Sequence, residues 1–202
     1  FQVFLNLHML YMKKKSLLFT LLVLLNLYAP FTFSDNFSND FDNLDVMAKT
    51  LSEQSESLNP DVIKLGLKAY LNARQHGLAQ KELLTIIDYS KPSTENRFWV
   101  FNLRNHKMLF QTLVAHGKNS GDKFATRFSN QPQSLASSFG VFLTGKTYLG
   151  HHGYSLKLMG LEPGVNDKAQ SRAIVVHAAG YVNQFIAHHF GRIGRSWGCP
   201  AL

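Results

Sequence analysis

The stretch RFWVFNL at residues 97–103, followed by KMLFQTLVA at residues 107–115, decides the fold class. Both stretches are rich in aromatic and aliphatic residues, and here the apolar period changes from 3.6 to 2, which is typical of β-strands. Only Arg104, Asn105 and His106 separate the two stretches. A connection this short predicts a β-hairpin.

Further apolar segments downstream also have the pattern of strands, and glycine-containing loops separate them. One short helix is expected close to the end of the chain. The sequence therefore predicts a mainly β protein, with a β-sandwich or barrel-like mixed sheet and short helices. The expected strands are 139–144, 154–159 and 172–177, the loops between them are 145–153 and 160–170, and the expected helix is 181–190.

Helical patterns precede this β-rich part. Asn59 suits an N-cap, Pro60 suits the first helical position, and Gly77 suits the residue after the last turn. A second amphipathic helix is expected over 80–87. Residues 59–94 are thus predicted to form a helical preface, and residues 35–58 a polar linker that becomes a short helix.

Residues 12–34 have the pattern of an export signal. Three lysines at 13–15 precede an apolar, leucine-rich segment at 16–29, and a polar stretch follows before Asp35. An uncleaved anchor is the alternative, although this apolar segment is shorter than the roughly 20 residues that span a bilayer. Residues 1–11 do not begin with methionine and are expected to be a non-native or misassigned leader.

Composition supports a folded protein. The 202 residues are 45% hydrophobic and 12% aromatic, which is ample for a core, and the formal net charge is +8. A basic surface favours partners that carry carboxylates or other anions. Nucleic acid is not an expected partner because no basic run is interleaved with aromatic residues.

The only cysteine of the chain, Cys199, lies between Gly198 and Pro200. A lone cysteine with a histidine elsewhere is a candidate nucleophile and base, and His177 follows a β-rich run. A reactive thiol needs a lowered pKa, for which His177, Arg195 and a helix beginning at Pro200 are the candidate causes. The alternative is a buried cysteine that serves only as a small apolar side chain.

Two motifs support the reactive interpretation: IVVHAA at residues 174–179 and RSWGCPAL at residues 195–202. Together they resemble the catalytic motif of the murein L,D-transpeptidases of the YkuD type. The resemblance covers roughly residue 97 to the end, and it departs from the family pattern at Trp197, where the family has histidine, and at Pro200.

The resemblance implies acyl transfer at a peptide stem of peptidoglycan. Cys199 would be the nucleophile and His177 the base, while Ser196, Trp197 and Gly198 would form the motif and the oxyanion-binding amides. A thioester would pass to an amine of another stem, giving a 3-3 crosslink, or to water. No metal and no organic cofactor is implied. Residues 95–202 would form the catalytic domain, which we expect to be truncated because the chain stops three residues after Cys199.

Substrate contacts are expected from Arg195, for a stem carboxylate, and from His152 and Tyr154, which lie near one another in the chain. Paired histidines at 151–152 and 188–189 leave a zinc site as a weaker alternative. The implied location is exported, in the periplasm or cell envelope, without stable membrane insertion once the signal is removed. A non-catalytic wall-binding protein and a different thiol enzyme are the alternative functions; the oligomeric state is not predicted.

Overall fold

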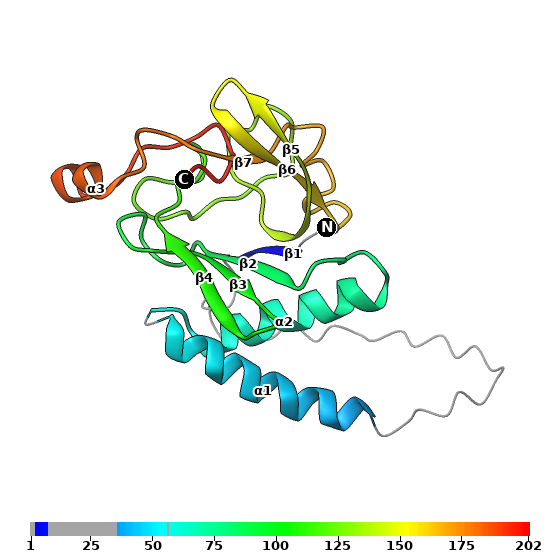
Figure 1. The fold of residues 1–202 in the computed structure, drawn as a ribbon. Helices are drawn as coiled ribbons and strands as arrows, with labels where there is room; N and C mark the ends of the chain where they lie inside the picture. The colour runs from blue at the N-terminus through cyan, green and yellow to red at the C-terminus, as the bar shows by residue number, and fades with distance from the viewer. Residues whose placement is uncertain (1–2, 8–35, 56) are drawn as a thin grey trace, which may run out of the picture.

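The computed structural model describes residues 3–7, 36–55 and 57–202 (Figure 1). Within this part of the chain, one mixed sheet of seven strands is the main element, in the order β4-β3-β2-β1-β5-β6-β7. Strands β1 and β2 are parallel, and each other neighbouring pair is antiparallel. The strands are β1 (Val3–Leu7), β2 (Leu83–Asp88), β3 (Phe98–Asn102), β4 (Lys107–Thr112), β5 (Gly140–Gly150), β6 (Gly153–Gly160) and β7 (Val175–His177).

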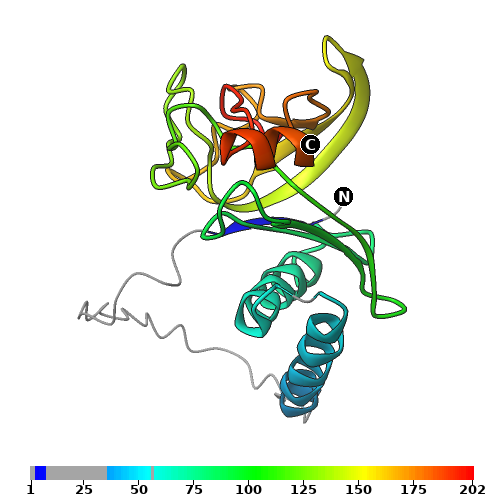
Figure 2. The same ribbon diagram turned by 90° about the vertical axis from the view of Figure 1, so that its left-hand side faces the viewer.

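Three helices accompany the sheet: α1 (Asn36–Gln54), α2 (Pro60–Gln75) and α3 (Gln184–Phe190). Helices α1 and α2 lie on one side of the sheet, and the loop-rich C-terminal segments lie on the other side (Figure 2). The predicted class, mainly β with short helices, is confirmed. None of the helices in the described ranges is long and apolar enough to cross a membrane.

Helix α2 begins and ends where the sequence predicts. The Asn59 side chain accepts a hydrogen bond of 2.8 Å from the backbone N–H of Asp61, Pro60 is the first helical residue, and Gly77 has a φ of 70°. Its buried face, which includes Ile63 and Leu67, packs against the sheet with Leu84 and Ile86 of β2.

The second predicted helix, residues 80–87, is wrong. Residues 83–88, LLTIID, form strand β2, which pairs with β1 on one side and β3 on the other. Five of its six residues are buried because helix α2 covers one face, with Ile86, and an apolar cluster containing Ile87 covers the other. Such a short apolar run buried on both faces has no clear period, so its pattern does not distinguish a strand from a helix.

Residues 3–7 form strand β1 in the middle of the sheet, between β2 and β5. Val3 packs in the cluster beneath the helices, and Phe4 packs on the opposite face with its ring 6.1 Å from that of Phe98 and 6.0 Å from that of Phe142. The sequence interpretation of residues 1–11 as a non-native or misassigned leader did not anticipate this packing of residues 3–7 in the sheet. The predicted signal segment, residues 12–34, lies entirely outside the described residues.

Several other boundaries also differ from prediction. Helix α1 is 19 residues long where a linker and a short helix were expected, because Leu44, Ala48 and Leu51 bury one face at helical spacing. Strand β5 continues through residues 145–150, which were expected to be a loop. The hairpin β3-β4 is confirmed, and its turn includes His106 with a φ of 52°.

Candidate active site

The loop that carries Cys199 is held in shape by Ser196. The Ser196 hydroxyl donates a 2.6 Å hydrogen bond to the carbonyl of Cys199 and accepts one of 3.1 Å from the N–H of Gly198. Gly198 has a φ of 127°, and a Cβ at this position would lie 2.8 Å from the carbonyl oxygen of Ala136. Only glycine fits this turn, which explains the Ser-x-Gly-Cys spacing physically.

A second segment, residues 115–118, fixes the loop from both ends. The N–H of Ser196 donates to the carbonyl of His116 at 2.9 Å, and the N–H of Lys118 donates to the carbonyl of Ser196 at 2.8 Å. On the far side of Cys199, the N–H of Ala115 donates to the carbonyl of Ala201 at 2.8 Å. The segment that carries Cys199 is therefore hydrogen-bonded to residues 115–118 both before and after the cysteine.

Strand β7 brings His177 to this loop. Ala201 forms a parallel bridge with His177, and the N–H of Leu202 donates to the carbonyl of His177 at 2.8 Å. The expectation that Pro200 begins a helix is therefore wrong: residues 200–202 are extended and pair with β7. The N–H of Leu202 is used in this pairing, so no helix N-terminus supports the thiol in the described chain.

Cys199 and His177 line one cavity of about 550 Å³. Both are partly shielded from solvent, with His177 only 6% exposed. The cavity also contains cationic, imidazole and aromatic side chains from the β5-β6 hairpin and from the segments next to β7. These further lining residues are Tyr148, His151, His152, Ser155, Arg172, Ala173, Ile174, Val175, Tyr181, Arg195, Ser196 and Trp197.

The tautomer of His177 follows from its backbone contact. Its Nδ1 lies 2.9 Å from the carbonyl oxygen of Ala178, an acceptor, so Nδ1 carries the proton and Nε2 is the free base. Burial lowers the pKa of His177 below its usual value, and the nearby His152 lowers it further, although the Ala178 contact opposes this shift. His177 is therefore neutral near pH 7 and able to accept a proton.

The pKa of the Cys199 thiol is raised above its ordinary value, contrary to the requirement inferred from sequence. Burial is the main cause, and a hydrogen bond from the backbone of Val175 and the positive charge of Arg172 only partly offset it. The Sγ atom lies 3.6 Å from the carbonyl oxygen of Ala173, which can accept a weak hydrogen bond from the thiol. At rest, the pair is thus a protonated thiol and a neutral imidazole.

Arg172 is the cation beside the thiol. It donates to the carbonyl of Ala136 at 2.7 Å, to the hydroxyl of Ser138 at 2.6 Å, to the hydroxyl of Ser134 at 3.0 Å and to the carbonyl of Ser129. All of these acceptors are neutral oxygens, so they order the guanidinium without cancelling its charge.

Of the three residues predicted to contact substrate, two line the cavity and one does not. Arg195 lines the cavity but already donates to the carbonyl of Gly121 at 3.0 Å and pairs with Asp122 at 3.3 Å. His152 lines the cavity and stacks on His177. Tyr154 is 81% exposed and does not line the cavity, whereas Tyr148 on β5 does.

Sequence reasoning missed Tyr148 and Tyr181 as lining residues. Tyr148 was assigned to a loop, and the signal that could have found it is the alternation of residues along β5 once that strand is extended to residue 150. Trp197, the departure from the family motif, is 75% exposed at the rim of the cavity, and the Lys118 ammonium lies 5.9 Å from its ring centre.

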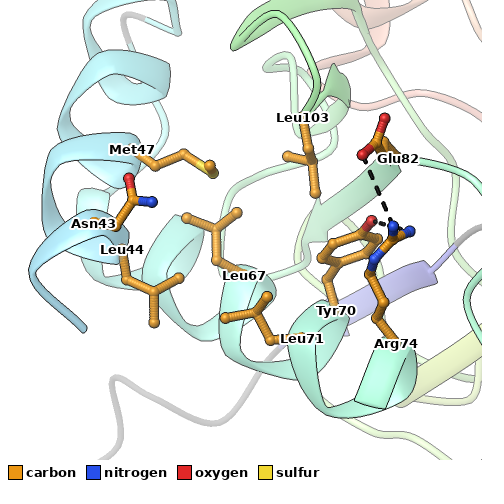
Figure 3. A pocket seen from close by; sticks show the side chains of 9 residues that line it. All are labelled: Asn43, Leu44, Met47, Leu67, Tyr70, Leu71, Arg74, Glu82 and Leu103. Carbon is orange, nitrogen blue, oxygen red and sulfur yellow. Dashed lines mark hydrogen bonds and ion pairs between the residues drawn. The ribbon is translucent and has the colours of Figure 1, made fainter. Parts of the chain in front are cut away.

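A second cavity, of about 220 Å³, lies between the two long helices and the sheet (Figure 3). Apolar side chains such as Leu44, Met47 and Leu67 line it, and an Arg74–Glu82 pair lies on its rim. It contains neither Cys199 nor His177, so the cavity beside β7 is the candidate active site.

The fold and this cavity define a mainly β protein in which a motif cysteine and a strand-borne histidine face a common space. A family profile for the L,D-transpeptidase catalytic domain, YkuD_2, matches residues 54–202. The chain therefore belongs to this family, which acts on peptidoglycan. The match begins upstream of the residues that first suggested the family and includes α2 and β2. No curated protein and no solved structure matches the chain.

Proposed function

We propose that this protein is a peptidoglycan L,D-transpeptidase that works through a thioester on Cys199. The observation that carries the proposal is the common cavity of Cys199 and a neutral His177, in a chain of the L,D-transpeptidase family. The basic net charge fits stem peptides that bear carboxylates. The donor is a tetrapeptide stem with a diamino acid at its third position and D-Ala at its fourth.

In the first half-reaction, Nε2 of His177 takes the thiol proton as Sγ of Cys199 attacks the carbonyl carbon between the third and fourth residues. The C–N bond then breaks, the imidazolium returns the proton to the departing D-Ala amine, and a thioester remains. Burial disfavours the separated thiolate, so proton transfer to His177 accompanies substrate binding instead of preceding it.

In the second half-reaction, the side-chain amine of another stem attacks the thioester carbonyl. His177 accepts the proton that this amine loses and gives it back to the departing sulfur, so the enzyme returns to its starting state. The new amide is a 3-3 crosslink. Water in place of the amine hydrolyses the thioester and gives L,D-carboxypeptidase activity.

The oxyanion and the stem carboxylates need separate donors. The N–H of Gly198 already donates to the Ser196 hydroxyl, so the oxyanion would face the N–H groups of Trp197 and Cys199. Arg172 is the better source of positive charge for a carboxylate, because Arg195 is paired with Asp122. Both guanidinium groups line the cavity.

We place the protein in the cell envelope or periplasm, on the basis of the export pattern at residues 12–34. Cleavage near Ser34 would also separate β1 from the rest of the sheet, leaving β2 and β5 with facing unpaired edges. Retention of the leader as a spanning anchor keeps β1 on the same chain, but Lys13, Lys14 and Lys15 would hold residues 3–7 on the inner side of the membrane, away from the exported sheet. The mass of the exported protein distinguishes these two cases.

Carbapenem acylation tests the proposed chemistry. The full chain is incubated with a carbapenem and its mass is measured; the expected result is one covalent adduct, with no adduct on the Cys199→Ser variant. A tetrapeptide stem should lose D-Ala and gain an amine acceptor under the same conditions. Absence of both adduct and stem turnover, together with sedimentation on peptidoglycan, would instead support a non-catalytic wall-binding protein.

A further inference from the structure

The turn between β5 and β6 places a second histidine directly on the candidate base. The rings of His152 and His177 are stacked, with centroids 4.6 Å apart and an angle of 23° between their planes. Ser155 of β6 pairs with His177 of β7, so the hairpin end at residues 151–153 extends past the end of β7 and lies over the His177 ring.

This stack limits a tilt of the His177 ring that the hydrogen bond to the Ala178 carbonyl does not prevent. The hydrogen bond from Nδ1 to the Ala178 carbonyl fixes one edge of the imidazole, but the ring can still tilt about that edge. A second ring parallel to it blocks the tilt on one side. The two contacts together fix the plane in which Nε2 presents its lone pair.

The stack also acts on the charge that His177 gains during catalysis. A neutral aromatic face within about 6 Å stabilises a cation, so neutral His152 favours the imidazolium form of His177. A protonated His152 in the same position has the opposite effect, because two positive rings at this separation repel each other.

The surroundings offer no carboxylate to offset that repulsion among the residues that line the cavity. His151 lies edge-on to His152 at 5.2 Å, with a plane angle of 77°. The other titratable or charged groups in the cavity are Tyr148, Tyr181, Cys199, Arg172 and Arg195, and Asp122 is engaged by Arg195 outside the lining.

We propose that His152 is a positioning residue that holds the His177 ring by stacking while neutral and suppresses acylation of Cys199 when protonated. This inference rests on the proposed function for its role in catalysis, but the ring contact itself does not depend on that function. In this proposal His152 acts on the reaction only through His177, whereas the sequence predicted that His152 contacts the substrate directly.

Two substitutions of His152 distinguish the effect of ring stacking from the effect of its positive charge. His152→Ala removes both the ring and the titration, whereas His152→Phe keeps a flat aromatic ring and removes the titration only. Leu149→Ala is the matched control, because Leu149 lies on the same hairpin, is 76% exposed and does not line the cavity. All three are compared with the unchanged full chain.

The first readout is the second-order rate of carbapenem acylation as a function of pH. We expect His152→Ala to slow acylation about tenfold near pH 7.5, and His152→Phe to restore the rate to within about threefold of that of the unchanged protein, which corresponds to recovery of at least about half of one pK unit. On the acid side, the rate of the unchanged protein should fall more steeply with decreasing pH than that of His152→Phe.

The second readout needs no turnover. In protein with ¹⁵N-labelled histidine, the His177 ring titration followed by NMR should move to higher pH in His152→Phe, because the neighbouring positive charge is gone. A His177 titration that stays unchanged in this variant would overturn the proposal. So would an acid limb as steep as that of the unchanged protein, or a Leu149→Ala effect as large as that of His152→Ala. If the unchanged protein is not acylated at all, the proposed function fails, whereas the NMR result still decides the inference.

Discussion

Burial is the largest cause of the pKa shift of several ionisable residues near the candidate site, and Cys199 is the most informative of them. Its raised pKa has burial as the largest cause, so free thiolate is scarce at neutral pH. We expect the rate of iodoacetamide alkylation of the folded protein to rise only beyond the usual thiol range near about pH 8.5. The same protein in denaturant provides the reference, and a lower inflection in the folded state than in denaturant would contradict the expectation.

His116 is the second such residue and reports on stability. It is 1% exposed, and burial, followed by the charge of Arg97, lowers its pKa from 6.5 to about 4. The unfolded chain therefore binds a proton between these values and the folded chain does not, so stability is complete above pH 6.5 and falls as pH decreases towards 4.

The difference of about 2.5 pK units corresponds to roughly 3 kcal/mol of unfolding free energy lost across that pH range. Denaturant unfolding at several pH values measures it. His116→Asn places an amide oxygen near the position of Nδ1 and can still accept the hydrogen bond that Arg97 gives to this atom at 2.8 Å, so its stability should depend less on pH. His188→Gln, exposed on α3, is the control. Equal slopes for all three proteins would contradict the assignment.

Among the secondary-structure elements, those specified by local signals could be predicted from sequence. Helix α2 has its N-cap, its first-turn proline and its terminal glycine within the segment itself, and the β3-β4 hairpin has its turn between two apolar runs. Strand β2 could not be identified in this way, because its six residues become a strand only by pairing with β1 and β3, which lie far away in sequence.

The same distinction applies to the candidate site. Cys199 and His177 could be predicted, because their motifs are short and specific. The Ala178 carbonyl contact, the position of Arg172 beside the thiol and the His152 stack could not, because each depends on which segments meet beside β7. The raised thiol pKa was missed for the same reason, since burial is a property of the folded chain.

The N-cap of α2 tests whether residues within the segment itself specify this helix. Asn59→Ala removes the side-chain acceptor for the N–H of Asp61, and the unfolding free energy should fall by about 1 kcal/mol. Asn59→Asp keeps an acceptor and should stay close to the unchanged protein. Urea unfolding measures both, and an alanine variant as stable as the unchanged protein would show that the cap is not needed.

The complete sheet depends on strand β1, which connects its two halves. Without residues 3–7, β2 and β5 lose their shared neighbour, and Val3 and Phe4 leave the two clusters on opposite faces of the sheet. Loss of one buried phenylalanine costs about 3 to 5 kcal/mol by itself. We therefore expect the chain of residues 35–202 to melt at a much lower temperature than the full chain, and Phe4→Ala to lie between them.

Calorimetry of the three proteins at equal concentration measures this order. If residues 35–202 alone give the same cooperative melt and the same acylation rate as the full chain, then β1 is dispensable, and removal of a leader near Ser34 is compatible with the fold. If they melt early, as the buried Phe4 side chain requires, the sheet needs β1, and residues 12–34 then act neither as a cleaved signal nor as a spanning anchor, because both would keep residues 3–7 away from an exported domain. The melt of residues 35–202 thus tests the export hypothesis as well as the fold, because β1 lies on the N-terminal side of the export pattern.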